Sequence, residues 1–313
     1  IAAIFGSHSA ITTSSDIRLN LNLESPPVGW KIRDTNALKQ VTADLLSYEP
    51  VALTVESGDP FWLQNSHVSF VKNRAKSRIL VTHKMPNYKK NDLIYHPPVL
   101  ALGVGCERGV SEGELEKLIR KVLRDNKLAP ESIACIVSID LKANESAIHW
   151  IATKYGVPAR FFDVATLKKQ TSRLETPSDI VFKETGCYGV AEGAALAAVG
   201  AAGLLIRSKV KSLRATCAVA LSRNDIDPMN IGKPQGMLAI IGIGPGSNDW
   251  ITPESRNALI NSTDIVGYGL YLDLIEDFTH GKTLHRSELS QEEKRTRLAL
   301  DLAASGARVA LVC

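Results

Sequence analysis

The stretch Val99-Leu-Ala-Leu-Gly-Val-Gly-Cys-Glu-Arg-Gly109 predicts a buried strand that opens into a glycine-rich loop. Its first residues are almost all apolar, and its glycines lack the Cβ that would keep a ligand away from the backbone. A helix is expected next, because Ser111 and Glu114 have the spacing of a capping box and apolar residues follow at helical intervals. Such a turn can be purely structural, so the rest of the chain must indicate whether a ligand binds there.

The length of 313 residues suggests two or three domains with separate hydrophobic cores. A net charge of +4 is too small to indicate a nucleic-acid partner. No apolar run of about 18 residues could span a bilayer and the chain does not open with a signal peptide, so we expect a cytoplasmic protein. The five cysteines are dispersed without a C-x-x-C pair, so we expect neither a metal site nor a disulfide framework.

Residues 1–98 predict a small α/β unit with a helix over 36–46 and strands over 51–55 and 78–82. The first six residues are typical of the last turn of a helix that ends at Gly6. We therefore expect that the chain begins inside a longer one.

Residues 99–222 predict a regular alternation of strands and helices. Strand 133–139 leads into a polar loop and a helix that ends near Tyr155, strand 159–164 follows, and strands over 204–209 and 215–221 close the unit. Between them, a second glycine-rich loop opens an alanine-rich helix. Loops that follow the strands of an open α/β sheet gather at one edge, where ligands bind.

Three polar loops are therefore expected to form one site, although each of their residues also has a purely structural interpretation. Glu145 and Glu192 could be first-turn acids favoured by the helix dipole, and Lys142 a solvated loop lysine. The residues expected at this edge are Gly105, Cys106, Glu107, Arg108, Gly109, Asp140, Lys142, Glu145, Glu184, Gly186, Tyr188, Gly189 and Glu192.

Three motifs in this unit occur in order: Gly-Val-Gly-Cys-Glu-Arg-Gly, Ser-Ile-Asp-Leu-Lys-Ala-Asn-Glu and Gly-Cys-Tyr-Gly-Val-Ala-Glu-Gly-Ala-Ala-Leu. With them, residues 99–222 resemble the C-terminal domain of the cobalt-precorrin-5A hydrolases of cobalamin biosynthesis. Residues 1–98, which open with Ile-Ala-Ala-Ile-Phe-Gly-Ser-His-Ser-Ala-Ile-Thr-Thr-Ser-Ser-Asp, are similar to the central domain of that family, entered partway. The glycine-rich N-terminal domain of the family is not in this sequence.

This resemblance implies opening of a ring-bound δ-lactone with release of acetaldehyde. That chemistry needs a base for water or an alcohol and a cation for acetate and propionate side chains. We expect Glu145 and Glu192 to supply the base, and Lys142 and Arg108 the cation. The residues expected to bind substrate are Gly105, Cys106, Arg108, Gly109, Gly186 and Gly189.

Residues 223–236 are rich in Asp, Asn, Gly and Pro and predict an exposed linker before a third unit, 237–313. This unit opens with Met237-Leu-Ala-Ile-Ile-Gly-Ile-Gly-Pro-Gly246, a strand that leads into glycines whose spacing departs from a dinucleotide fingerprint. Thr252 and Pro253 are expected to begin the next helix, and Ser290 with Glu293 has the spacing of another capping box.

Three features of the third unit, the Ile-Gly-Ile-Gly-Pro-Gly loop, the Thr-Pro helix start and Asp-Ile-Val-Gly-Tyr-Gly-Leu-Tyr, resemble the N-terminal part of the tetrapyrrole methylases, specifically precorrin-3B C(17)-methyltransferase. The resemblance implies S-adenosylmethionine in a cleft between two α/β domains. One wall would contain Gly242, Gly244, Pro245 and Gly246. A Ser-Gly-Asp loop and a second domain should follow Cys313, so we expect a chain truncated at both ends, without methyltransferase activity of its own.

Together these features predict three consecutive α/β units of a fused corrin-ring enzyme. Its expected partner is a precorrin or cobalt-precorrin, without nucleic acid or membrane, and the methylase part could form a homodimer. A corrinoid-binding module that delivers intermediates to the methylase domain would share every motif. An unrelated nucleotide-binding protein is disfavoured, because the phosphate-binding spacings are missing.

Overall fold

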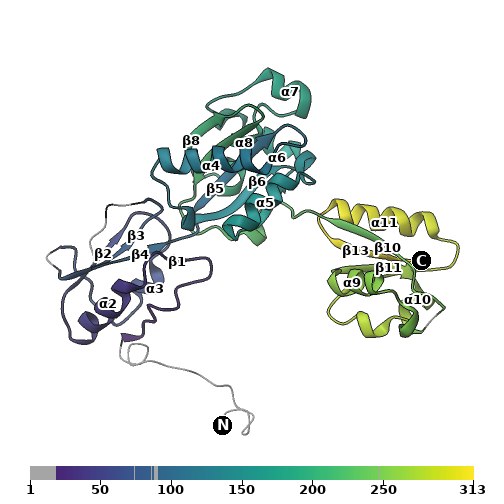
Figure 1. Cartoon of the computed structure of the whole chain (residues 1–313), viewed down its shortest axis with the longest axis horizontal. Helices are drawn as coiled ribbons and strands as arrows, with labels where there is room; N and C mark the ends of the chain where they lie inside the picture. The colour runs from purple at the N-terminus through teal and green to yellow at the C-terminus, as the bar shows by residue number, and fades with distance from the viewer. Residues whose placement is uncertain (1–18, 74, 86, 88–90, 246) are drawn as a thin grey trace, which may run out of the picture. The chain divides into compact units, whose positions relative to one another are not determined.

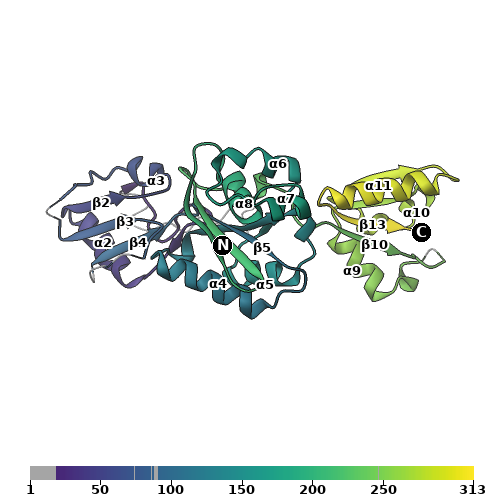
Figure 2. The ribbon, with the colours of Figure 1, turned by 90° about the horizontal axis from the view of Figure 1, so that it is seen from above.

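The computed structural model describes residues 19–313 except 74, 86, 88–90 and 246 (Figures 1 and 2). The chain forms two compact units that divide after Gly232. The first unit contains two sheets and the second contains one, which confirms the predicted α/β class. The predicted helix end at 1–6 lies outside the described residues.

The first sheet has the strand order β1-β4-β3-β2, in which only the edge strand β1 (Lys31–Ile32) runs antiparallel to its neighbour. Its other strands are β2 (Val51–Val55), β3 (Ser77–Val81) and β4 (Asp92–His96). Helix α2 (Asn36–Leu46) buries its predicted apolar side on this sheet, and a short helix α3 (Phe61–Gln64) follows β2.

The second sheet has the order β7-β6-β5-β9-β8 and carries the three resemblance motifs. Strands β5 (Leu100–Cys106), β6 (Ile133–Ile139) and β7 (Ala159–Phe162) are parallel, whereas β8 (Leu204–Lys211) and β9 (Ala215–Leu221) form an antiparallel hairpin beside β5. Helices α4 (Glu112–Asp125) and α5 (Ser146–Tyr155) pack on one face, and α6 (Val164–Lys168) and α8 (Val190–Val199) on the other. Helix α7 (Asp179–Thr185) buries no residue.

The glycine-rich loop predicted within 99–109 begins later than the sequence suggests. Strand β5 continues to Cys106 and contains Gly103 and Gly105. Large and small residues alternate along this strand, and the small ones face α8. A Cβ added to Gly103 would lie 1.8 Å from the carbonyl oxygen of Ala191 in α8. These glycines therefore let a helix approach the sheet.

The two predicted capping boxes also differ from the structure. Ser111 caps α4 by accepting a hydrogen bond from the backbone N–H of Glu114 (3.3 Å), but the Glu114 carboxylate binds the β8–β9 turn instead. In the second unit the N-cap residue is Gln291, and Ser290 has a left-handed φ of 64°. In α4, the Glu114 carboxylate thus accepts hydrogen bonds from Ser212 and Arg214, and not from the N-cap backbone as in a capping box.

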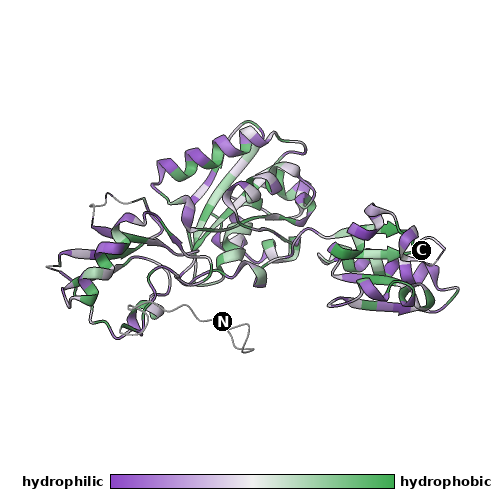
Figure 3. Cartoon of the chain, turned by 60° about the horizontal axis from the view of Figure 1, so that its bottom comes forward, coloured by the Kyte–Doolittle hydropathy of each residue, from purple (hydrophilic) through white to green (hydrophobic). Residues whose placement is uncertain are grey.

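The second unit contains a parallel sheet with the order β10-β13-β11-β12. Its strands are β10 (Met237–Ile241), β11 (Asp264–Tyr268), β12 (Thr283–Ser287) and β13 (Arg308–Val312), and its helices are α9 (Pro253–Asn261), α10 (Gly269–Asp273) and α11 (Glu292–Ala304). Thr252 caps α9 and Pro253 is its first residue, as predicted. Figure 3 shows apolar residues along the strands of the sheets.

The predicted linker 223–236 is not exposed along its whole length. Ile226 is buried and donates its backbone N–H to the carbonyl of Pro98 (2.8 Å). The buried Arg160 donates its Nε–H to the carbonyl of Pro228 (2.6 Å). The first part of this segment therefore belongs to the first unit.

In the described part of the chain, no helix is both long and apolar enough to cross a membrane.

Candidate functional site

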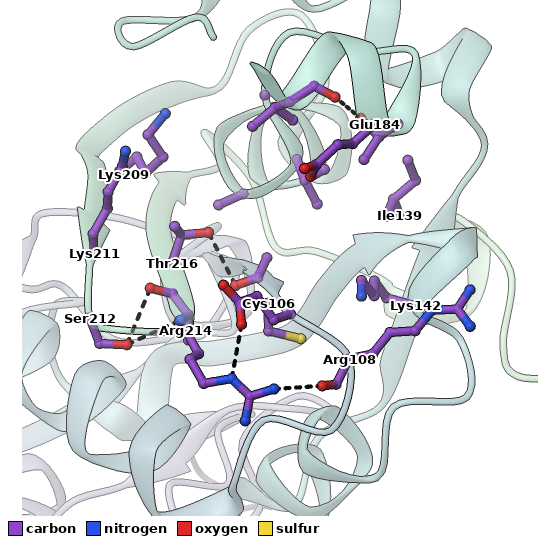
Figure 4. Close-up of a pocket in the computed structure, with 18 of the residues that line it drawn as sticks. Cys106, Arg108, Ile139, Lys142, Glu184, Lys209, Lys211, Ser212, Arg214 and Thr216 are labelled. Atoms are coloured by element: carbon purple, nitrogen blue, oxygen red, sulfur yellow. Dashed lines mark hydrogen bonds and ion pairs between the residues drawn. The ribbon is translucent and has the colours of Figure 1, made fainter. Parts of the chain in front are cut away.

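A cavity of about 520 Å³ lies where β5 and β6 end, and we call it the cationic pocket (Figure 4). Residues from all three predicted loops line it, together with the β8–β9 hairpin and α7. Its polar and charged lining residues are Cys106, Glu107, Arg108, Lys142, Glu184, Thr185, Lys209, Lys211, Ser212, Arg214 and Thr216. The three loops that the sequence placed at one edge thus meet around one cavity.

The hairpin supplies three of the five cations of this pocket, Lys209, Lys211 and Arg214. Sequence reasoning did not include them in the site, because the rule for parallel strands concerns only their carboxyl ends. The basic turn between β8 and β9 was the available signal in the sequence. Strand β9 pairs antiparallel with β5, and its first residue Ala215 lies opposite Cys106. That register brings the turn beside the first loop.

Arg214 fastens the loop that follows β5. Its Nε lies 2.9 Å from the carboxylate of Glu107, and its Nη2 donates to the carbonyl of Arg108 (2.8 Å). Figure 4 shows these contacts between the turn and the loop. The loop also contains Gly109, whose φ of 68° is left-handed and suits glycine. Arg214 therefore holds the polar groups of this loop in one arrangement.

Lys142 and Glu145 form a partly buried ion pair at 3.5 Å. The other carboxylate oxygen of Glu145 accepts a hydrogen bond from the backbone N–H of Gly109 (3.0 Å). Lys142 lines the pocket, whereas Glu145 stands behind it. Glu145 thus joins the first and second loops.

Glu192, 1% exposed, lies outside the pocket lining. One carboxylate oxygen accepts from the backbone N–H groups of Glu175 (2.9 Å) and Thr176 (3.0 Å). The other accepts from the Thr176 hydroxyl (2.8 Å) and the backbone N–H of Lys209 (2.8 Å). Burial raises the pKa of this carboxyl, but the hydrogen bonds lower it by more, so the net pKa is lowered.

This geometry corrects the prediction of Glu192 as a general base. Its carboxylate has no free face toward the pocket, and it joins α8, the segment before α7 and strand β8. The pairing of β8 with β9 is irregular between Arg207 and Val210, which leaves the backbone N–H of Lys209 available to Glu192. Glu192 therefore connects two walls of the pocket, the segment that leads into α7 and strand β8. We call its four hydrogen bonds the Glu192 brace.

Cys106 lines the pocket as a neutral thiol. Burial raises the pKa of its thiol to about 11, so little thiolate exists at neutral pH. The Thr216 hydroxyl, which also lines the pocket, donates to the carbonyl of Gly105 (3.1 Å). Cys106 thus contributes shape and not a nucleophile.

The remaining predicted residues are divided between the pocket and its supports. Gly189 lines the pocket and precedes α8, and Gly186 ends α7 with a left-handed φ of 79°. The Tyr188 ring stacks on Phe182 of α7 with ring centroids 4.5 Å apart. Asp140 is exposed and outside the lining.

The glycine loop of the second unit follows β10. A Cβ added to Gly242 would meet no atom of the described residues within 4 Å, so among them the backbone there is open to a ligand. Gly244 has a φ of 68°, and a Cβ there would lie 3.1 Å from Trp250. Pro245 is exposed, and Gly246 lies outside the described residues.

Among the described residues, no group of three His, Cys, Asp or Glu side chains could hold a metal ion.

Three family models match successive parts of the chain. Residues 25–97 match the cobalamin biosynthesis central region, residues 100–220 the cobalamin synthesis G C-terminus, and residues 237–313 the tetrapyrrole (corrin/porphyrin) methylases. The predicted order of the three regions is therefore confirmed.

The chain is 32% identical over 242 residues to a cobalt-precorrin-5A hydrolase from Priestia megaterium, a match that covers 71% of this chain and 63% of the relative. It is 46% identical over 121 residues to the protein CobE from Sinorhizobium sp, covering 39% of this chain and 79% of the relative. It is 40% identical over 76 residues to a probable cobalt-factor III C(17)-methyltransferase from Salmonella typhimurium, covering 24% of this chain and 32% of the relative.

The chain thus spans less than two thirds of the hydrolase and about a third of the methyltransferase. CobE, by contrast, is matched over 79% of its length. The chain belongs to the cobalamin-biosynthesis family that includes CobE and the C-terminal part of cobalt-precorrin-5A hydrolase, and it joins the hydrolase-like regions to the N-terminal part of a tetrapyrrole methylase.

Proposed function

We propose that the cationic pocket binds the carboxylate-bearing edge of a precorrin or cobalt-precorrin, and that the hydrolase-like part opens its δ-lactone and releases acetaldehyde. The observation that carries the proposal is the composition of the pocket, in which five cations surround apolar residues at the mouth. Leu141 and Leu213 line it and are 56% and 90% exposed. A corrin precursor has an apolar macrocycle edged by acetates and propionates, which suits such a surface.

Arg108 and Lys211 are the cations best placed to bind substrate carboxylates. Both line the pocket, and the described part of the chain gives neither side chain an ion-pair partner. Lys209 is less available, because its ammonium donates to the carbonyl of Thr176 (2.8 Å). Arg108 and Lys142 lie across the pocket from Lys209 and Lys211 in Figure 4, so carboxylates on two sides of a macrocycle could be held at once.

Glu184 is the carboxylate that we propose as the base. It lines the pocket from α7 and is exposed, whereas the other lining carboxylate, Glu107, is paired with Arg214. Its role would be to take a proton from the water that attacks the lactone carbonyl, or from the alcohol formed when the lactone C–O bond breaks. A nearby cation would stabilise the negative charge that develops on oxygen.

A binding module without catalysis is the second candidate function. The observation that favours it is the scarcity of free carboxylates, because Glu107, Glu145 and Glu192 all have partners. The two functions differ in one measurement, the acetaldehyde released when the protein is incubated with cobalt-precorrin-5A. We expect release by the wild type, strong loss in Glu184→Gln and retained binding. Tight binding without acetaldehyde from the wild type would favour the module.

For the second unit we propose S-adenosylmethionine as cofactor and C(17) of the corrin precursor as methyl acceptor. The cofactor would supply an electrophilic methyl group. Gly242, Gly244 and Pro245 would hold it through the backbone, and the open space above Gly242 fits that role. We also propose a homodimer through this unit, supported by exposed apolar side chains such as Trp250 and Leu300 and testable by sedimentation equilibrium.

A further inference from the structure

A second cavity of about 520 Å³ lies beside the C-terminal half of α4 and shares no residue with the cationic pocket. We call it the basic groove. Its lining comes from α4, the end of α5, the segment that follows α4 and one residue after β3. The lining residues are Met85, Glu116, Arg120, Leu123, Arg124, Lys127, Leu128, Pro130, Lys154 and Tyr155.

The floor of the basic groove is apolar and fixed. Leu123 and Leu128 are buried in the core, and Pro130 begins a short 3-10 helix beside them. Burial raises the pKa of Tyr155, so this side chain is neutral at physiological pH. The groove thus has an apolar floor of the kind that small-molecule sites have.

Among the described residues, the rim carries four cations and one carboxylate. Glu116 pairs with Lys154 (2.7 Å) and Arg120 (3.3 Å), so its charge is already opposed. Arg124, 76% exposed, pairs with Asp125 at 3.2 Å. Such exposed pairs are weak, so an anion in the groove could take over the arginines.

Lys127 has a backbone conformation that usually requires glycine. Its φ is 52°, and it follows the C-cap of α4, where Leu128 donates its N–H to the carbonyl of Leu123 (2.9 Å). The carbonyl of Lys127 accepts from the N–H of Met85 (2.7 Å), which fixes the segment further. The described residues offer its ammonium no ion-pair partner. A lysine in this position is strained, and strain at a groove rim is typical of a functional side chain.

We propose that the basic groove is a second tetrapyrrole-carboxylate site, in which an apolar macrocycle edge lies on Pro130 and Tyr155 and carboxylates bind Lys127 and Arg124. Charge complementarity and volume support this occupant over a neutral ligand. This ligand class is that of the proposed function, on which the inference rests, whereas the groove itself is separate from the cationic pocket. Two sites on one unit would let a labile intermediate wait on the protein beside the one being processed.

The test uses the full chain and uroporphyrin III, an aromatic macrocycle with eight carboxylates, in a calorimetric titration. We expect two binding events in the wild type. Lys127→Gly should weaken one event about tenfold and raise the melting temperature, because it removes both the ammonium and the strain. Arg124→Ala should weaken the same event. Lys121→Ala, an exposed residue of the same helix outside the groove, should change neither event.

Lys211→Ala in the cationic pocket separates this proposal from the proposed function, because it should weaken only the other event. A single event that Lys211→Ala alone weakens would overturn the second site and leave the first intact. Unchanged affinity in both Lys127→Gly and Arg124→Ala would also overturn it. Binding of laurate or of a poly-glutamate peptide that Lys127→Gly weakens, without uroporphyrin binding in the groove, would assign the groove to a different ligand and equally refute the proposal.

Discussion

Replacing Glu192 by glutamine tests the brace between α8, the segment before α7 and strand β8. Glutamine keeps the size of the side chain but turns one acceptor into a donor. If its NH₂ group takes the place of the oxygen near Lys209, the Thr176 hydroxyl can rotate and accept, whereas the backbone N–H of Lys209 faces another donor. The N–H groups of Glu175 and Thr176 keep an acceptor but lose its charge.

We expect Glu192→Gln to lower the free energy of unfolding of the first unit by about 2–4 kcal/mol, the sum of one buried unpaired donor and two weakened charge-assisted bonds. Urea denaturation followed by tryptophan fluorescence measures this, with Trp250→Phe as background so that the signal reports the first unit. Glu184→Gln, an exposed carboxylate without a hydrogen-bond partner among the described contacts, is the matched control. A loss no larger than in the control would refute the brace.

The same brace predicts a pH dependence. Because the net pKa of Glu192 in the folded state is lowered, the unfolded chain binds this proton more readily than the folded one. Its contribution is therefore complete above the ordinary pKa of 4.5 and is lost as the pH falls through the folded value. Acid denaturation should be less steep in Glu192→Gln. An identical acid profile in both proteins would contradict the predicted linkage.

Four further predictions concern single residues. Arg108→Ala should weaken uroporphyrin binding by about 1–3 kcal/mol in calorimetry and leave stability unchanged, as expected for a charge-assisted hydrogen bond; unchanged affinity would remove Arg108 from the site. Gly103→Ala should destabilise the first unit by about 3 kcal/mol or more in urea, because its Cβ would collide with the Ala191 carbonyl; a small loss would show that α8 can move away. Cys106→Ser should keep acetaldehyde release within about threefold of wild type, because the thiol is protonated; complete loss would indicate that the Cys106 thiol acts as a nucleophile. His83 is buried and its pKa is lowered to about 4, so the first unit should lose stability between pH 6.5 and 4 as the unfolded chain protonates, and His83→Gln should reduce that loss in acid titrations.

Periodicity in the sequence predicted the elements whose apolar residues face one core. Helix α2 and strands β2 and β6 have the predicted bounds, and α4 buries the apolar residues expected of it. The error at Gly103 has a physical reason, because a glycine in a strand and a glycine in a loop look alike until the neighbouring helix is known. The alternation of large and small residues in β5 was the available signal.

The site was predictable only in part. The loops after β5 and β6 could be placed because parallel strands end at one edge, and Arg108 and Lys142 line the pocket that they form. The sequence could not indicate that Glu192 points into the protein, since its partners at Glu175 and Lys209 are separated from it by 17 residues on either side. The contact with Lys209 lies where the pairing of β8 with β9 is irregular, a feature that the sequence does not indicate.

Helix α7 forms part of the pocket wall without contributing a buried residue to the core. Segments with few buried apolar contacts open locally at a small fraction of the free energy of global unfolding. Its amides should therefore exchange with deuterium long before those of β5 and β6, which lie in the centre of the sheet. A ligand of the cationic pocket could then enter or leave by a local opening of α7 while the sheet and the Glu192 brace stay intact, and such an opening would not expose the core to aggregation.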